Sequence, residues 1–173
     1  MSARAAWRLE SLGFTQVYHY VAGKADWLAA GLPREGEHAQ IPVIGDLALP
    51  DVPTCGLDTA VGDVAKLMAS ARWDQCVVVN EERVVLGRIR RDELDEDPAA
   101  LAEDVMQDGP TTFRPSVGAH EMLDYMQRRA KMRETLVTDP EGRLLGVIRR
   151  DDLERAVHDL HAHSDADDDK GGG

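Results

Sequence analysis

The 173-residue sequence has little of several features that mark particular protein classes. It has only two cysteines, Cys55 and Cys76, whose spacing fits neither a zinc site nor a disulfide framework, which favours a reducing cytoplasm. It has no run of about 18 apolar residues, so we expect neither a membrane span nor a signal peptide. Lys and Arg number 20 against 32 Asp and Glu, and the resulting charge of −12 argues against binding to nucleic acid or anionic membranes.

What the sequence does contain is an internal repeat. The segment LGRIRRDEL at residues 86–94 returns as LGVIRRDDL at residues 145–153, an offset of 146 − 87 = 59. A repeat at one fixed separation indicates a duplicated structural unit. The two copies align over residues 54–94 and 112–153, and each has the pattern strand, helix, strand, strand, helix. The sequence therefore predicts an α+β fold built from two β-α-β-β-α units.

The sequence on either side of the repeat has a different character. Residues 2–13 have the apolar spacing of a helix, residues 14–21 alternate like a strand, and residues 23–30 resemble a second short helix. Prolines and glycines in residues 31–53 indicate a linker. The expected divisions are an N-terminal segment at 1–33, a linker at 34–45, a first unit at 46–98, a second unit at 99–162, and a disordered acidic, glycine-ending tail at 163–173. The segment that connects the two copies, residues 98–107, is expected to be a helix.

The N-terminal segment resembles the C-terminal part of a rhodanese domain. The resemblance rests on residues 2–14, on Val17-Tyr18 and on Gly23-Lys24-Ala25-Asp26-Trp27. In that family the catalytic cysteine loop precedes this segment, so it would lie upstream of Met1, and neither cysteine of this chain matches it. The resemblance implies either a decayed remnant fused to another module or a start site further upstream. The plain alternative is an amphipathic extension.

The repeated region resembles tandem cystathionine β-synthase (CBS) domains, also called a Bateman module, over residues 46–160. The matching features are Thr54 and Thr112 before a short strand, Val105-Met106 before the second copy, and a closing Gly-x-Ile-x-x-x-acid-Leu in both copies. The resemblance implies two units packed sheet against sheet, with a cleft on each side that accepts an adenosine-type ligand. It also implies a flat homodimer.

The same resemblance identifies candidate ligand contacts. The acid that holds the ribose hydroxyls in the family falls on Glu93 and Asp152, where a carboxylate suits the positive end of a helix. The family's Ser or Thr three residues earlier is replaced by Arg90 and Arg149. The strands that line the base pocket in the family correspond to Thr54, Cys55, Gln75, Cys76 and Val77 in the first copy, and to Thr112, Phe113, Glu134, Thr135 and Leu136 in the second.

The arginines have two interpretations. Arg90-Arg91 and Arg149-Arg150 either form a cationic patch that binds phosphate, or they are surface residues paired with neighbouring acids and worth at most about 1 kcal/mol each. Phe113 either stacks on a base or belongs to the core.

The remaining candidates favour structural roles. Cys55 and Cys76 fit buried reduced thiols better than a redox sensor. The histidines near the C-terminus, His158, His161 and His163, fit solvated residues better than metal ligands, so we expect no metal. Trp73 and Met132, which occupy equivalent positions in the repeat, are interpreted as core.

These observations predict a regulatory module and not an enzyme, because no nucleophile–base set and no phosphate-binding glycine loop is present. The expected ligand is an adenosine-type nucleotide or related anion, such as AMP, ADP, ATP or S-adenosylmethionine, and no cofactor is required. Binding would be signalled by a conformational change. The alternative is a ligand-free dimerisation or interaction module, and a truncated rhodanese–CBS sulfurtransferase is a third, weaker hypothesis.

Overall fold

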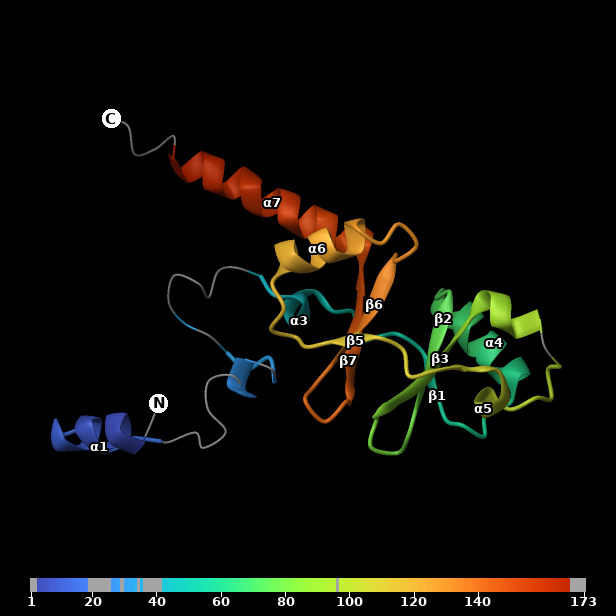
Figure 1. Ribbon diagram of the computed structural model, residues 1–173, viewed down its shortest axis with the longest axis horizontal. Helices are drawn as coiled ribbons and strands as arrows, with labels where there is room; N and C mark the ends of the chain where they lie inside the picture. The colour runs from blue at the N-terminus through green and yellow to red at the C-terminus, as the bar shows by residue number, and fades with distance from the viewer. Residues whose placement is uncertain are drawn as a thin grey trace.

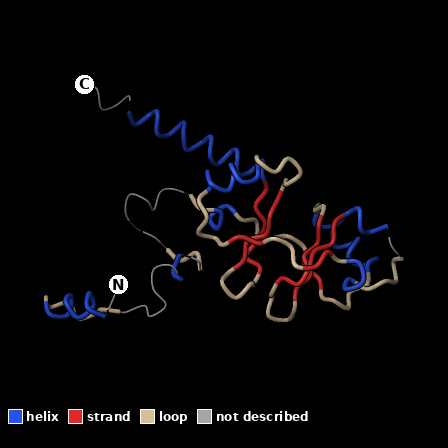
Figure 2. Tube along the Cα trace, viewed as in Figure 1, coloured by secondary structure: helices blue, strands red, loops and turns tan. Residues whose placement is uncertain are grey.

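Two small sheets stand side by side at the centre of the molecule, and their helices cover the outer faces (Figures 1 and 2). The computed structural model describes residues 3–18, 26–28, 30–33, 35, 42–95 and 97–168. The expected α+β class with two pseudo-symmetric units is confirmed, because each sheet repeats the same arrangement of strands.

Unit 1 is built on a four-stranded sheet with the order β1-β2-β3-β4. Its elements are β1 (Thr54–Cys55), α4 (Val61–Ala71), β2 (Gln75–Val79), β3 (Val85–Arg90), the 3-10 helix η2 (Arg91–Asp95), α5 (Ala102–Val105) and β4 (Gln107–Asp108). Strand β1 runs parallel to β2, and β2 pairs with β3 as an antiparallel hairpin. The apolar face of α4 packs Val64 and Met68 against Ile89, which closes the core of this unit.

Unit 2 is built on the three-stranded sheet β5-β6-β7. Its elements are α3 (Ile44–Leu47), β5 (Thr112–Phe113), α6 (Ala119–Gln127), β6 (Glu134–Thr138), β7 (Leu144–Arg149) and α7 (Arg150–Asp168). The register of its hairpin repeats that of unit 1, since Leu136 pairs with Val147 as Val77 pairs with Arg88. Each hairpin also has one irregularity at the equivalent position.

The closing segments of the two units differ, although their sequences are nearly the same. Unit 2 ends in the long helix α7, whereas unit 1 has only the short 3-10 helix η2. Pro98 follows η2 and restricts the preceding residue to extended backbone, so the helix cannot continue there. The helix expected over residues 98–107 is likewise shorter than predicted and covers only Ala102–Val105.

The two units exchange the segments that precede them. The short helix α3, which comes before β1, packs in the core of unit 2, while α5, which comes before β5, packs in the core of unit 1. The backbone follows the same symmetry, because Leu49 pairs with Val147 in β7 as Gln107 of β4 pairs with Arg88 in β3. The chain therefore crosses between the units twice, and neither core is complete without a segment from the other side.

The repeated glycine makes this crossing possible. A Cβ atom at Gly146 would lie 2.6 Å from the carbonyl oxygen of Leu49, and one at Gly87 would lie 3.1 Å from the carbonyl oxygen of Gln107. Both contacts are with the backbone of the crossing segment, which cannot move aside as a flexible side chain can. Glycine is needed at position 146, where the nearest atoms are backbone, whereas the atom nearest to a Cβ at Gly87 belongs to the flexible side chain of Met106.

The sheets meet through an apolar layer and a pair of turns. Trp73 and Val77 of unit 1 pack with Leu136, Leu144 and Val147 of unit 2, and all five side chains are buried. The two hairpin turns are joined by backbone hydrogen bonds at their tips, between residues 83–85 and residues 142–144. The interface thus holds the two units as one body about an approximate twofold axis.

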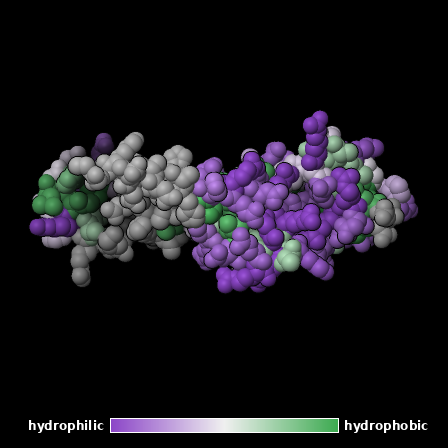
Figure 3. Space-filling model, turned by 90° about the horizontal axis from the view of Figure 1, so that it is seen from above, coloured by the Kyte–Doolittle hydropathy of each residue, from purple (hydrophilic) through white to green (hydrophobic). Residues whose placement is uncertain are grey.

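Helix α1 (Ala3–Ser11), in the N-terminal segment, lies away from both units (Figure 1). Helix α1 (Ala3–Ser11) confirms the first expected helix, and Trp7, Leu12 and Phe14 are exposed on and after it. Figure 3 shows hydrophobic surface at the end of the molecule that carries the N-terminal segment, whereas the face over the two units is largely hydrophilic. Residues 14–18 are not a strand, in contrast to the expectation for 14–21, because the structure gives them no neighbouring strand to pair with; 19–21 lie outside the described residues.

The helix expected over 23–30 is seen as a helical turn at residues 26–28, and its other residues are partly undescribed. None of the helices among the described residues has the length and apolar character that a membrane span requires.

We expect Gly146→Ala to lower the free energy of unfolding by about 1–3 kcal/mol, because the new methyl group pushes the Leu49 backbone out of register with β7. Gly118→Ala is the matched control, since a Cβ at Gly118 has no atom within 4 Å. Urea denaturation of both variants measures the difference. Equal stabilities would contradict the close approach of Leu49 to β7.

Candidate functional site

The interface between the sheets is apolar at one end and polar at the other. Side chains two residues apart on a strand point to the same face, so Gln75 faces the same gap as Val77, and Glu134 faces the same gap as Leu136. Their cross-strand partners are Arg90 and Arg149, respectively. The approximate twofold axis therefore brings together one amide, one carboxylate and two guanidinium groups beside the apolar layer.

Unit 1 adds a further cation to this end of the interface. Arg88 lies two residues before Arg90 on β3, and its Nε and Nη2 atoms both donate to Oε1 of Gln107, at 2.9 and 2.8 Å. Gln107 belongs to the crossing strand β4, so the exchanged segment fixes the position of this guanidinium.

The cluster carries more positive than negative charge. Burial raises the pKa of Glu134, and Arg149, Arg90 and Arg88 oppose that shift in this order. Burial also lowers the pKa of Arg88, and repulsion from the positive charge of Arg90 lowers it further. One partly buried carboxylate is thus shared among three arginines, which leaves an electrostatic preference for a further anion.

A cleft of about 280 Å³ opens from this cluster between the two units. It is lined by Arg88, Arg90, Thr111, Arg129, Lys131, Met132, Glu134 and Thr135. Two of the cations come from β3 of unit 1 and two from the loop between α6 and β6 of unit 2. Because the chain as a whole has a charge of −12, a cleft with four cations and one acid is a local exception.

Two polar side chains near this cleft have no hydrogen-bond partner among the described residues. Thr135, which lines the cleft, is 2% exposed and its hydroxyl is unpaired. Gln75 is 1% exposed, and both ends of its amide are unpaired. Buried polar groups of this kind cost about 1–3 kcal/mol each unless a partner is supplied.

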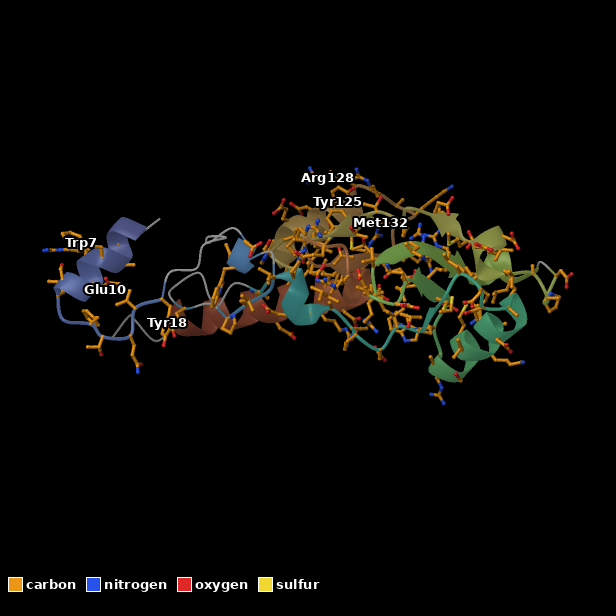
Figure 4. All side chains as sticks on the ribbon, turned by 90° about the horizontal axis from the view of Figure 1, so that it is seen from below. Trp7, Glu10, Tyr18, Tyr125, Arg128 and Met132 are labelled. Atoms are coloured by element: carbon orange, nitrogen blue, oxygen red, sulfur yellow. The ribbon has the colours of Figure 1, made fainter. Side chains whose placement is uncertain are left out.

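The unit 2 wall of the cleft is held by another arginine of the repeat. The Nη2 atom of Arg150 donates to the carbonyl oxygens of Met126, Arg129 and Met132, at 2.5, 2.9 and 2.5 Å. The guanidinium of Arg129 also lies 3.7 Å over the ring of Tyr125. Figure 4 shows Tyr125, Arg128 and Met132 gathered at the end of α6, far from the N-terminal residues Trp7, Glu10 and Tyr18.

A second, more open pocket of about 510 Å³ shares Arg90 and Glu134 with the cleft. Its other lining residues are Asp74, Arg91 and Asp92, so its charges are nearly balanced. Arg91 is ion-paired with Asp74 at 2.8 Å, and both side chains are largely exposed. This pocket favours an anion less than the cleft does.

The base-pocket residues expected in unit 1 are mostly part of its core. Cys55 and Cys76 are both buried, and the hydrogen bond between their side chains, together with burial, raises the pKa of Cys76. Val77 belongs to the apolar layer between the sheets, and Thr54 is its partner in the parallel pair β1–β2.

The residues expected in unit 2 are divided between core and cleft. Thr135 lines the cleft. Phe113 instead packs edge-on against Tyr125, with ring centroids 5.0 Å apart, and Leu136 is buried in the apolar layer. Thr112 pairs with Leu136 on β5, next to Thr111 at the cleft.

The carboxylates and arginines of the repeat make different contacts in the two units. Glu93 accepts a hydrogen bond from the backbone N–H of Arg90 at 2.6 Å, and Asp152 is ion-paired with Arg155. Arg90 lines the cleft, while the guanidinium of Arg149 lies 3.9 Å over the ring of Trp73. Arg91 is ion-paired with Asp74, and Arg150 donates to backbone carbonyl oxygens. Phosphate binding at Arg90 stays a prediction.

Sequence reasoning missed three cations of the cleft, namely Arg88, Arg129 and Lys131. The signal for Arg88 was present, since it alternates with Arg90 on one strand and stands where the second copy has Val147. No group of three or more His, Cys, Asp or Glu residues within the described parts of the chain is arranged to hold a metal ion.

Comparison with known proteins agrees with this architecture. The model of the CBS domain matches residues 44–96 and 102–159, which is more than half of the sequence, so the chain belongs to the CBS domain family. The rhodanese-like N-terminal remnant is not confirmed, because the match begins at residue 44. No curated protein matches the sequence.

Several solved structures share the fold at low sequence identity. The cytosolic domain of the Mg²⁺ channel MgtE, solved with ATP, is 21% identical with a TM-score of 0.61; the alignment covers 68% of this chain and 49% of that one. CBSX2 from Arabidopsis thaliana, solved with AMP, is 19% identical with a TM-score of 0.62, covering 69% and 98%. The CBS domain pair of protein MJ0100, solved with 5-methylthioadenosine and S-adenosyl-L-methionine, is 15% identical with a TM-score of 0.59, covering 69% and 98%.

We expect Glu134→Gln to stabilise the protein at neutral pH, because it removes a carboxylate whose ionised form is disfavoured by burial. A raised carboxyl pKa makes the protonated folded state the favoured one, so the wild type loses stability relative to the variant as pH rises above about 4.3. Below that pH the two proteins converge. Melting temperatures from pH 3.5 to 7.5 measure this gap, and a gap that widens toward acid would contradict the assignment.

Proposed function

We propose that this chain is a non-catalytic regulatory module that binds an adenosine-type nucleotide in the cleft between its two units. The single observation that carries the proposal is the cationic cleft to which both units contribute. The proposed setting is the cytoplasm, where adenine nucleotides are available as signals.

The chemistry of the cleft fits a phosphate group better than a neutral ligand. A guanidinium presents a planar fork of donors to phosphate oxygens, and an ammonium adds a mobile point charge. Arg88 and Arg90 supply the first kind of group from unit 1, and Lys131 supplies the second from unit 2.

The solved relatives support an adenosine-type ligand. The structures of the MgtE cytosolic domain, CBSX2 and the MJ0100 domain pair were obtained with ATP, AMP and S-adenosyl-L-methionine, respectively. This chain spans about half of the MgtE domain, and magnesium transport is not part of the proposal. The ligands AMP, ADP, ATP and S-adenosylmethionine are therefore the set to compare.

Signalling follows from the way the cleft is assembled. Because the cations come from both units, a ligand that contacts all of them binds better to one relative arrangement of the units than to others. A partner, or the N-terminal segment, would detect that arrangement.

The second candidate function is a ligand-free module that pairs with another copy of itself. It is favoured by the carboxylates expected to hold a ribose, since Glu93 and Asp152 both have partners within the chain. A homodimer is compatible with either function, so dimerisation alone does not distinguish them.

We expect saturating ATP or AMP to raise the melting temperature by about 5–10 °C, since a ligand at 100 times its Kd adds about 2.7 kcal/mol of folding stability.

Lys131→Ala should weaken the affinity for ATP about tenfold, because it removes one charged contact from the cleft. Lys66→Ala is the matched control, since Lys66 is exposed on α4 and paired with Asp63. Calorimetric titration of the three proteins measures the affinities.

The melting temperatures measured with the ligand panel also distinguish the two candidate functions. If no member of the panel changes the melting temperature at millimolar concentration, the nucleotide function is wrong. A concentration-dependent dimer seen by sedimentation would then support the ligand-free module.

A further inference from the structure

The approximate symmetry of the chain predicts two equivalent clefts, but the residues that line the two positions differ. Met132 and Trp73 occupy equivalent positions, since 132 − 73 = 59, and so do Arg149 and Arg90, since 149 − 90 = 59. In the cleft described above, Met132 and Arg90 line an open space. At the equivalent place in the other unit, the indole ring of Trp73 lies under the guanidinium of Arg149, 3.9 Å away.

Trp73 is an integral part of the structure at that position. Its side chain is 3% exposed and belongs to the apolar layer between the sheets, beside Val77 and Val147. A stack of arginine on tryptophan is stabilising, and more so when it is partly shielded from water. A ligand would have to displace this ring from the core to reach the equivalent position.

The cleft position that Trp73 fills also lacks other groups that make the cleft beside Met132 suitable for anions. At the 59-residue offset, Arg88 corresponds to Val147, Arg129 to Ser70 and Thr135 to Cys76. Two of the four cations and the unpaired hydroxyl are therefore absent from the equivalent positions. The equivalent positions keep two cations, Arg149 and Arg72, so the duplication has kept the fold of both units but the full set of four cations at only one of the two clefts.

We propose that each chain binds one ligand, in the cleft beside Met132, and that Trp73 is the built-in occupant of the other cleft. This inference rests on the proposed function and adds its stoichiometry and its site. The Trp73–Arg149 stack also indicates the chemical class of the ligand. A flat aromatic ring joined to an anionic group lies under Arg90 as the indole lies under Arg149, with its charge toward Arg129 and Lys131.

The decisive variant is Met132→Trp, which installs in the open cleft the residue that fills the other one. We expect it to fold, because the cleft has room for the ring beside Arg90, and to weaken ATP binding about tenfold or more. Leu67→Trp, which adds the same ring at an exposed position on α4, is the matched control and should keep the wild-type affinity within about threefold. Calorimetric titration with ATP measures affinity and stoichiometry together.

The wild-type stoichiometry tests the inference even if Met132→Trp does not fold. One ATP per chain supports it, whereas two per chain overturn it. A folded Met132→Trp protein that binds ATP like the wild type also overturns it. If the wild type binds no ATP, AMP or S-adenosylmethionine at all, the proposed function itself fails, and that outcome is distinct from a stoichiometry of two.

Discussion

The packing of the β2–β3 hairpin against the β6–β7 hairpin is the constraint on which the rest of the structure depends. At one end of this interface buried apolar side chains such as Val77 and Leu136 exclude water and hold the units together. At the other end the same strands turn Arg90, Arg149 and Glu134 toward each other. The apolar layer stabilises the arrangement, and this stability allows an excess of positive charge to be kept partly buried.

The exchange of segments ties this interface to the site. Strand β4 lies against β3 beside Gly87, and Gln107 of β4 orients Arg88 at the cleft. On the other side, Arg150 binds the end of α6 and so fixes the loop that carries Arg129 and Lys131. In the motif Gly-x-Ile-Arg-Arg, the glycine and the second arginine of unit 2 thus hold the structure together, and the first arginine of unit 1 lines the cleft.

The fold could be predicted because the duplication is visible in the sequence itself, where residues 86–94 return at residues 145–153. The crossing of α3 and α5 could not, since it depends on contacts between residues far apart in the chain. The site was predicted less well. Arg90 and Thr135 were expected from position and line the cleft, whereas Cys55 and Leu136 lie in the core. The residues around Arg88 were missed because their convergence depends on how the two sheets face each other.

We propose that a nucleotide binds between the units and contacts both at once. Hydrogen exchange of the full chain with and without saturating ATP tests it most directly. We predict that ATP slows exchange together in residues 86–91 of unit 1 and 128–136 of unit 2, because both segments line the cleft. Slower exchange confined to one unit would contradict the claim.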